Sequence, residues 1–204
     1  EVMCACCNQN LPRTGYARNA CDNRLVRLFW GRIPIERGAS LFFYKAHSDT
    51  SRLLYQLKYG GHSETGDLLG RLVADEFAAD GFFDGITALV PVPLARQRER
   101  ERGYNQSVEI ARGISTATGI PVVGNVLERI SFHGSQTQKS RWERNENVEK
   151  AFRLTDASAV RNRHVLLVDD VITTGATLVA AAREILKAGN VKVSVLSLGF
   201  ANNE

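Results

Sequence analysis

The chain has 204 residues, of which 44% are hydrophobic and 24% charged, so its composition is that of a folded globular protein and excludes a disordered or fibrous one. This length is enough for one sizeable α/β domain with a small appendage. The net charge of +4 is mild, so any contact with a polyanion depends on local basic patches rather than on the total.

The chain contains no apolar run that approaches the ~20 residues needed by a membrane helix. No signal peptide is visible at the start, which reads EVMCACCNQN. We therefore expect a cytoplasmic protein with no membrane partner. The first residue is Glu1 and not Met, which is what a fragment of a longer chain would show.

The four cysteines lie close together at the start of the chain, at Cys4, Cys6, Cys7 and Cys21. Adjacent cysteines rarely pair with each other, so the pattern argues against a disulfide framework and for a reducing compartment. Cys4 and Cys7 form a C-x-x-C, the usual half of a structural zinc site, and a closed site needs four ligands. Zn²⁺ is therefore expected only if Cys6, Cys21, a distant His or upstream residues complete the set. The alternative is a group of free thiols.

Residues 1–40 contain turn formers and scattered charges, so we predict an irregular N-terminal segment there and a regular domain over residues 41–204. Phe29 and Trp30 stand in an apolar patch within the first segment. We expect both to pack into a core, because large aromatic side chains mostly serve burial.

The pattern of apolar residues beyond residue 40 changes repeatedly between the periods of a strand and of a helix. Asn105 or Ser107 is expected to cap the third helix, and Gly119 to end it. Strands that alternate with helices predict an α/β fold, with a mostly parallel sheet flanked by helices on both faces. The predicted strands cover residues 40–45, 86–93, 121–130, 164–168 and 191–200, and the predicted helices 50–59, 67–80, 108–119 and 177–189, with a break over 60–66.

The stretch VLLVDDVITTGATL, residues 165–178, runs from a buried strand into two carboxylates and then into a loop of hydroxyls and small residues. Ligands of open α/β sheets bind outside the carboxyl ends of the strands, so this loop lies at a ligand edge. It leads into a helix that begins near Thr177 or Leu178, and the free N–H groups of a helix N-terminus bind anions. The Lys and the spacing of a Walker loop are missing. The predicted phosphate loop consists of Thr173, Thr174, Gly175, Ala176 and Thr177.

Asp169 and Asp170 would repel a phosphate, so they must face another group of the same ligand. Vicinal ribose hydroxyls suit them, because carboxylates accept hydrogen bonds from hydroxyls and Mg²⁺ can add a further link. A 5-phosphorylated ribose satisfies both halves of the stretch. The less favoured alternative is a strand-end turn with a helix cap.

The same stretch resembles the phosphoribosyl-pyrophosphate (PRPP) motif of type I phosphoribosyltransferases. The resemblance implies the fold of that family, with Asp169 and Asp170 on the ribose hydroxyls of PRPP or of another 5-phosphoribosyl compound, and Mg²⁺ bound with it. It also implies that residues 173–177 bind the 5-phosphate.

Three further segments, residues 57–70, 89–112 and 144–154, resemble the ComF branch of that family, also called the GntX-like or competence-protein-F-like group. The likeness covers nearly the whole chain from Leu25 onward. ComF-like proteins usually begin with two C-x-x-C pairs, and here only the pair of Cys4 and Cys7 is present. Residues 1–40 are therefore interpreted as the remnant of a zinc-binding module, or as the hood that forms the acceptor pocket.

PRPP chemistry gathers negative charge on the pyrophosphate, so cations should stand beside it. The resemblance makes Lys58, Tyr59 and Gly60 candidates, and the alternative for Lys58 is a favourable helix end. Arg102, in ARQRERERGYNQS, is a further candidate because its planar fork suits phosphate oxygens. The alternative for that segment is a solvated loop whose charges partly cancel. Candidates for a flexible loop that closes over the substrate are Arg98, Arg100, Lys139, Arg141 and Arg144.

Two functions remain open at this point. The first is a phosphoribosyltransferase that transfers phosphoribose from PRPP to an unidentified acceptor, in nucleotide metabolism or in competence and DNA uptake. The second is a non-catalytic module of the same fold that senses PRPP or a nucleotide, or handles single-stranded DNA through its arginines. No catalytic residue is assigned, and a homodimer is kept open as an assembly.

Overall fold

The computed structural model describes residues 11–59, 63–130 and 151–201. None of the helices in these ranges is long and apolar enough to cross a membrane. The elements in chain order are η1 (Tyr16–Asn19), α1 (Arg24–Arg27), β1 (Gly38–Tyr44), α2 (Asp49–Tyr59), α3 (Ser63–Ala78), β2 (Ala88–Pro91), α4 (Arg96–Arg102), α5 (Gln106–Thr118), β3 (Leu127–Arg129), β4 (Phe152–Leu154), β5 (His164–Ile172), α7 (Ala176–Leu186) and β6 (Lys192–Ala201).

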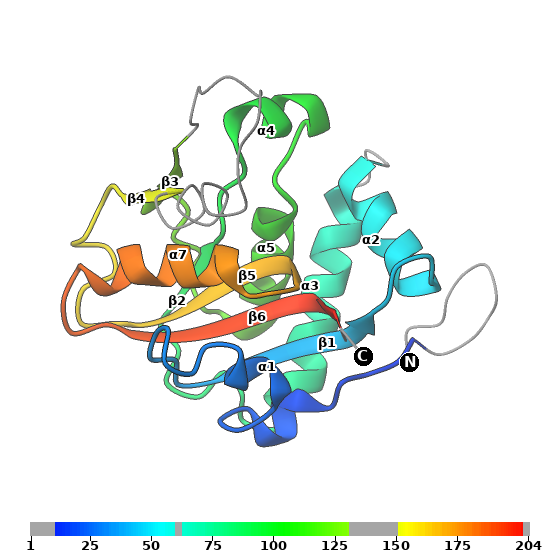
Figure 1. Cartoon of the computed structure of the whole chain (residues 1–204), viewed down its shortest axis with the longest axis horizontal. Helices are drawn as coiled ribbons and strands as arrows, with labels where there is room; N and C mark the ends of the chain where they lie inside the picture. Colours follow the sequence, from blue (N-terminus) through cyan, green and yellow to red (C-terminus); the bar gives the residue numbers. More distant parts are fainter. Residues whose placement is uncertain (1–10, 60–62, 131–150, 202–204) are drawn as a thin grey trace.

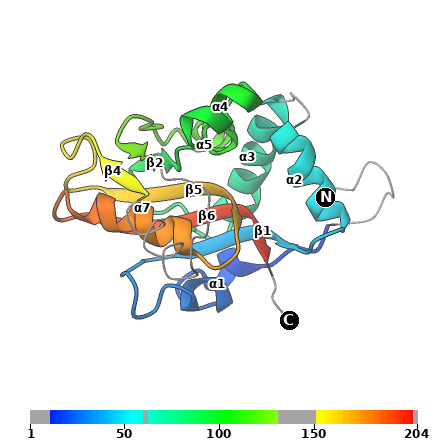
Figure 2. The ribbon, with the colours of Figure 1, turned by 45° about the horizontal axis from the view of Figure 1, so that its top comes forward.

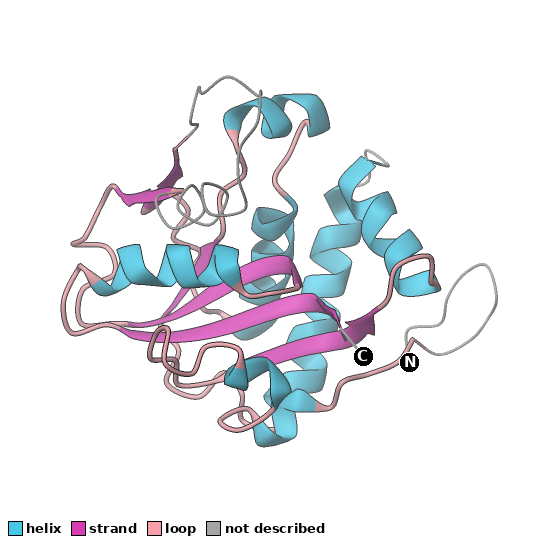
Figure 3. Ribbon diagram, in the orientation of Figure 1, coloured by secondary structure: helices cyan, strands magenta, loops and turns pink. Residues whose placement is uncertain are grey.

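The main sheet has the strand order β1-β6-β5-β2, and all three of its neighbouring pairs are parallel (Figures 1 and 3). Strand β5 therefore lies inside the sheet. Its Val168 is opposite Pro91 of β2 on one side and Leu196 of β6 on the other. The carboxyl ends of parallel strands meet at one edge, which becomes the ligand edge of the fold. A short antiparallel pair, β3 with β4, stands apart from this sheet. The α/β prediction is confirmed.

The sheet separates two hydrophobic layers, because successive side chains of a strand point to opposite faces. Val165 and Leu167 of β5 pack with α1 and α7, whereas Leu166 and Val168 pack with α2, α3 and α5. Figure 2 shows the sheet edge-on between these two sets of helices. Helices cover both faces, as the alternating sequence pattern predicts.

Several predicted boundaries differ from the structure. Helix α3 begins at Ser63, inside the predicted break, and β5 continues to Ile172 where the strand was predicted to end at Val168. Of the predicted strand over residues 121–130, β3 covers only Leu127–Arg129 and Val122 forms an isolated bridge. The arginine-rich segment for which a solvated loop was the alternative is the helix α4. The cap prediction is confirmed for Asn105, whose side chain accepts from the N–H of Ser107 at 3.0 Å.

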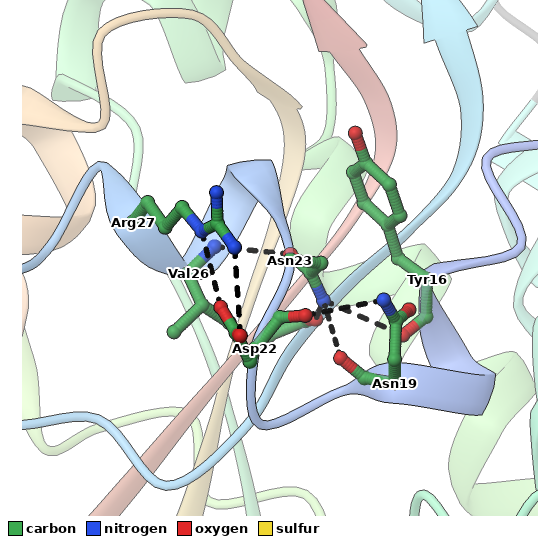
Figure 4. Close-up of polar contacts among 7 residues, drawn as sticks. Tyr16, Asn19, Asp22, Asn23, Val26 and Arg27 are labelled. Carbon is green, nitrogen blue, oxygen red and sulfur yellow. Dashed lines mark hydrogen bonds and ion pairs between the residues drawn. The ribbon is translucent and has the colours of Figure 1, made fainter.

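The N-terminal segment is fastened to the sheet through Asn23, which caps α1 and is buried (Figure 4). Its side-chain amide donates to the carbonyls of Gly38, at 2.8 Å, and Asn19, at 3.1 Å. Phe29 is fully buried in the layer shared with α7, as predicted. The prediction is wrong for Trp30, which is 61% exposed with the Arg27 guanidinium over its ring, because this short segment turns only one side towards the sheet.

Helices α3 and α5 approach each other at backbone distance through glycines. A Cβ added to Gly113 would lie 2.0 Å from the carbonyl oxygen of Asp67, and one added to Gly70 would lie 2.2 Å from that of Ile110. Contacts this short leave no room for any side chain on either glycine. The close approach fixes where α5 begins, and α5 begins at the ligand edge.

We expect Gly113→Ala to lower the free energy of unfolding by about 1–3 kcal/mol, because the added methyl forces α3 and α5 apart. This loss outweighs the gain of about 1 kcal/mol that Ala brings to an ordinary helix. Urea unfolding followed by circular dichroism measures the change. The matched control is Gly124→Ala, where an added Cβ meets nothing within 4 Å. Equal stabilities of the two variants would contradict the proposed close contact.

Candidate functional site

The two carboxylates lie within the last part of β5 and not beyond its end, since Asp169 is opposite Ser197 of β6 in the sheet. Both are half-buried at the carboxyl edge. Their positions differ from the prediction of a strand that ends at Val168. The reason is that β6 is ten residues long and keeps pairing with β5 as far as Ile172.

Each carboxylate has partners from a different helix. The ammonium nitrogen of Lys58, at the end of α2, lies 3.0 Å from Oδ2 of Asp170. Oδ1 of Asp169 accepts from the N–H of Asp170 at 2.9 Å and from the hydroxyl of Ser107, in the first turn of α5, at 3.4 Å. The two helices on one face of the sheet therefore meet the paired acids from two directions.

Burial raises the pKa of Asp169 to about 7, and the negative charge of Asp170 acts in the same direction. The N–H of Asp170, the charge of Lys58 and the hydroxyl of Ser107 oppose this shift. Asp169 is therefore divided between its two protonation states near neutral pH. A ligand that donates hydrogen bonds to the carboxylate would favour the ionised form.

The predicted phosphate loop leads from β5 into α7, which begins at Ala176. Gly175 adopts a left-handed conformation with φ 72°, and an added Cβ there would lie 3.3 Å from the ring of Phe29. The guanidinium of Arg32 donates to the carbonyl of Thr174 at 2.8 Å, which holds the loop from outside. The N–H groups that open a helix have no partners inside it. The loop therefore presents hydroxyls and helix-opening N–H groups at the same edge as the acids.

The hollow inside this loop has a volume of about 30 Å³ and is lined by Asp169 and residues 171–178. That is room for one or two water-sized atoms rather than a whole sugar.

The candidates for pyrophosphate binding lie where α2 and α4 end beside each other. The guanidinium carbon of Arg102 is 5.1 Å from the ring centroid of Tyr59, and its nitrogen is 3.5 Å from the hydroxyl. Lys58 is engaged by Asp170, as described above. The hydroxyl of Tyr104 donates to the carbonyl of Leu57, which ties the chain after α4 to α2. Gly60 lies outside the described residues.

The remaining candidates fall into two groups. Arg98 and Arg100 are exposed on α4. The others, Cys4, Cys7, Lys139, Arg141 and Arg144, lie outside the described residues. Cys21 is an exposed free thiol, and no group of three or more His, Cys, Asp or Glu side chains within residues 11–59, 63–130 and 151–201 is arranged to hold a metal.

Three residues of the edge were not predicted as parts of the site. Ser107 was considered only as a helix cap, Arg32 lay in the segment treated as irregular, and Arg129 lay in a predicted strand. Burial and the charge of Arg98 lower the pKa of Arg129, and Arg129 is close enough to the acids for the charge of Asp169 to oppose this shift. The segment that contains Ser107 carried a usable signal, because it follows the strand that ends beside β5. The placement of Arg129 depends on the pairing of β3 with β4, which no local pattern reveals.

The sequence profile described as the phosphoribosyl transferase domain matches residues 73–201, so the chain belongs to that family. Competence protein F of Haemophilus influenzae is 36% identical over 115 residues, which are 56% of this chain and 50% of that protein. The DNA utilization protein YhgH of Escherichia coli K12 is 32% identical over 151 residues, 72% of this chain and 66% of that one. These relatives confirm the predicted ComF-like branch of the type I phosphoribosyltransferases.

The chain spans half of the first relative and about two thirds of the second. Among solved structures, the glutamine PRPP amidotransferase from B. subtilis complexed with ADP and GMP has a TM-score of 0.43 and 25% identity. That match covers 64% of this chain and 25% of the other. Similarity at this level adds nothing to the family assignment.

We expect Asp169→Asn to raise the free energy of unfolding at pH 8 by about 1–3 kcal/mol, since each unit of pKa shift corresponds to about 1.4 kcal/mol. Asn keeps an oxygen acceptor for Ser107 but carries no charge beside Asp170. The native state holds a proton on Asp169 up to about pH 7, whereas the unfolded chain loses it near pH 4. The stability from this proton is therefore complete below about pH 4 and lost as the pH rises through 7.

The advantage of the variant should accordingly be small at pH 4, intermediate at pH 6 and complete at pH 8. Urea unfolding at the three pH values measures it. Asp80→Asn, an exposed carboxylate between α3 and β2, serves as the control and should show no such trend. An advantage that is equal at all three pH values would contradict the raised pKa.

Proposed function

We propose that the chain binds PRPP together with Mg²⁺ at the carboxyl edge of β5 and transfers phosphoribose to an acceptor. The observation that supports this most is the juxtaposition of two half-buried carboxylates, Asp169 and Asp170, with a helix-opening loop of threonines and glycine. Membership of the phosphoribosyl transferase domain family supports the same ligand.

Each part of the edge has a physical role in this proposal. The carboxylates accept hydrogen bonds from the two ribose hydroxyls, and the N–H groups opening α7, with the loop hydroxyls, bind the 5-phosphate. Arg32 and Phe29 hold the loop in its shape from behind, through the 2.8 Å bond to Thr174 and the contact at Gly175. The ligand is thereby oriented at both ends, which leaves its anomeric carbon in a fixed place between them.

The donor set fits Mg²⁺, because the ion prefers oxygen ligands and binds through one or two carboxylates together with phosphates. Asp170 attracts a cation already, since the ammonium of Lys58 lies 3.0 Å from its Oδ2. Asp169 and Asp170 would hold the ion, which would neutralise charge on the leaving pyrophosphate. Lys58 is then free to turn towards the pyrophosphate.

The proposal predicts that calorimetric titration with PRPP and Mg²⁺ gives saturable binding to the wild-type chain. The double variant Asp169→Asn/Asp170→Asn should bind at least about 100-fold more weakly, because each lost bond to a charged group costs about 1.5–3 kcal/mol. Asp80→Asn, an exposed carboxylate between the end of α3 and the start of β2, should bind as wild type does. Absence of PRPP binding by wild type would overturn the proposal.

Turnover is tested on the same protein by pyrophosphate release across a panel of nucleobases and amines. Release with one of them identifies the acceptor class. PRPP binding without release across the panel favours a PRPP or nucleotide sensor on the same fold.

A second candidate function, handling of single-stranded DNA, is favoured by a separate observation on α2. The rings of Tyr55 and Tyr59 lie 4.7 Å apart, are 64% and 60% exposed, and are followed by the guanidinium of Arg102 over Tyr59. We call these three residues the aromatic ladder. Exposed aromatic rings with a neighbouring arginine are what proteins use to bind unpaired bases without sequence preference. Two relatives are named for competence and for DNA utilization.

This candidate predicts that Tyr55→Ala and Tyr59→Ala each weaken binding of a fluorescent oligo-dT by about 5–100-fold, the worth of one stacked base. Fluorescence anisotropy measures the affinity, which should fall steeply with salt and fall again when Arg98, Arg100 and Arg102 are neutralised. Trp30→Ala is the matched control, as an exposed aromatic on α1's side of the sheet. An equal loss in that control, or a flat response to salt, would count against the ladder.

A further inference from the structure

A second cavity opens at the ligand edge, between α4 and β3. Its volume is about 630 Å³, within the range of small-molecule sites. Its apolar floor includes Pro91 and Val108, and its polar rim includes Asn105, Arg96 and Arg129. Because Pro91 pairs with Val168 in the sheet, the floor lies directly beside the strand position that precedes Asp169.

The charges around this cavity are unevenly matched. Glu128 is held by Arg96 at 2.8 Å and by Arg153 at 2.6 Å, so two of the neighbouring guanidiniums share one carboxylate. Within the described residues no carboxylate forms an ion pair with Arg129. Glu99 also lines the cavity, but it is exposed and not paired with Arg129.

Within the part of the chain that the structure describes, Arg129 is held in place by packing and not by an ion pair. Its guanidinium carbon lies 5.3 Å from the ring centroid of Phe152 on the paired strand β4, and the residue is half-buried. Burial and the charge of Arg98 lower its pKa, and the charge of Asp169 opposes this shift. A half-buried guanidinium is stabilised further when an anion binds beside it.

We infer that this cavity is an oxyanion site, in which the guanidinium of Arg129 binds a phosphate or carboxylate group of a ligand seated beside Asp169. The planar guanidinium suits both groups, because each offers two oxygens to its parallel N–H donors. The side-chain amide of Asn105 already donates to the carbonyl of Val92, and its oxygen accepts from the N–H of Ser107, so Arg129 carries the recognition.

Two ligands of the proposed reaction carry that chemistry, the pyrophosphate group of PRPP and an acceptor with an acidic group. In either case the inference extends the proposed function, because it places the second ligand group on the β2 side of the carboxylates. This is the side opposite to Lys58, which pairs with Asp170 from α2.

The test is calorimetry of the full chain with inorganic pyrophosphate and, separately, with benzoate as a carboxylated ring. We expect at least one of the two to bind wild type, and Arg129→Gln to weaken it about 10-fold or more, the worth of a charged hydrogen-bond pair. Arg129→Lys should recover part of the loss. The anion that depends on Arg129 identifies the source of the oxyanion.

Arg153→Gln is the matched control, since it removes an arginine of the same cluster whose charge Glu128 already compensates. It should change the affinity less than about twofold. Glu99→Gln should tighten binding, because it removes a like charge from the rim, an effect that a purely structural cavity would not produce. Melting temperatures confirm that each variant folds.

Lack of binding by both anions to wild type, or an equal loss in Arg129→Gln and Arg153→Gln, would overturn the oxyanion site. Ribose 5-phosphate distinguishes a failure of the oxyanion site from a failure of the proposed function. We expect this compound to bind to the loop of residues 173–177 both in wild type and in Arg129→Gln. If that compound and PRPP bind wild type and Arg129→Gln alike, and neither anion depends on Arg129, only the oxyanion site is wrong. If an anion depends on Arg129 while PRPP does not bind, only the proposed function is wrong.

Discussion

Two adjacent carboxylates at the end of an interior strand are the constraint on which the rest of this edge depends. Half-burial beside Asp170 raises the pKa of Asp169 to about 7, so the strand end is costly to keep in its ionised form. The surrounding elements compensate from three directions: α2 supplies the ammonium of Lys58, α5 the hydroxyl of Ser107, and β5 its own N–H.

The hydroxyl of Ser107 has a defined position because α5, which carries it, is held by packing contacts far from the ligand edge. Helices α3 and α5 touch through Gly70 and Gly113, and this backbone contact determines where the first turn of α5 lies. Asn105 then ties that turn to the end of β2 through a 3.0 Å bond to the carbonyl of Val92. The packing of α3 against α5 therefore determines where Ser107 meets the acids, although neither glycine contacts the ligand edge.

The sequence predicted the parts of this arrangement that local patterns encode. The apolar run before Asp169 and the turn of threonines with Gly175 after it predict a strand, a loop and a helix in order, and Asn105 is a recognisable cap. The strand nevertheless runs on to Ile172, because its length is decided by pairing with β6, a partner distant in sequence. The helix α4 was missed for a different reason: it has no buried residue and therefore no apolar period. Arg129 was missed because only the pairing of β3 with β4 brings it near the acids.

Helix α4 links the proposed surfaces of the molecule, although it contributes nothing to the core. It begins five residues after the end of β2, and side-chain contacts hold its two ends, Arg96 with Glu128 and Arg102 with Tyr59. The first contact borders the cavity of Arg129, and the second completes the aromatic ladder. A helix without buried side chains is stabilised mainly by such end contacts and belongs to the low-stability part of a fold. An anion in the cavity and a base on the ladder would therefore each act on the position of the same helix, from opposite ends.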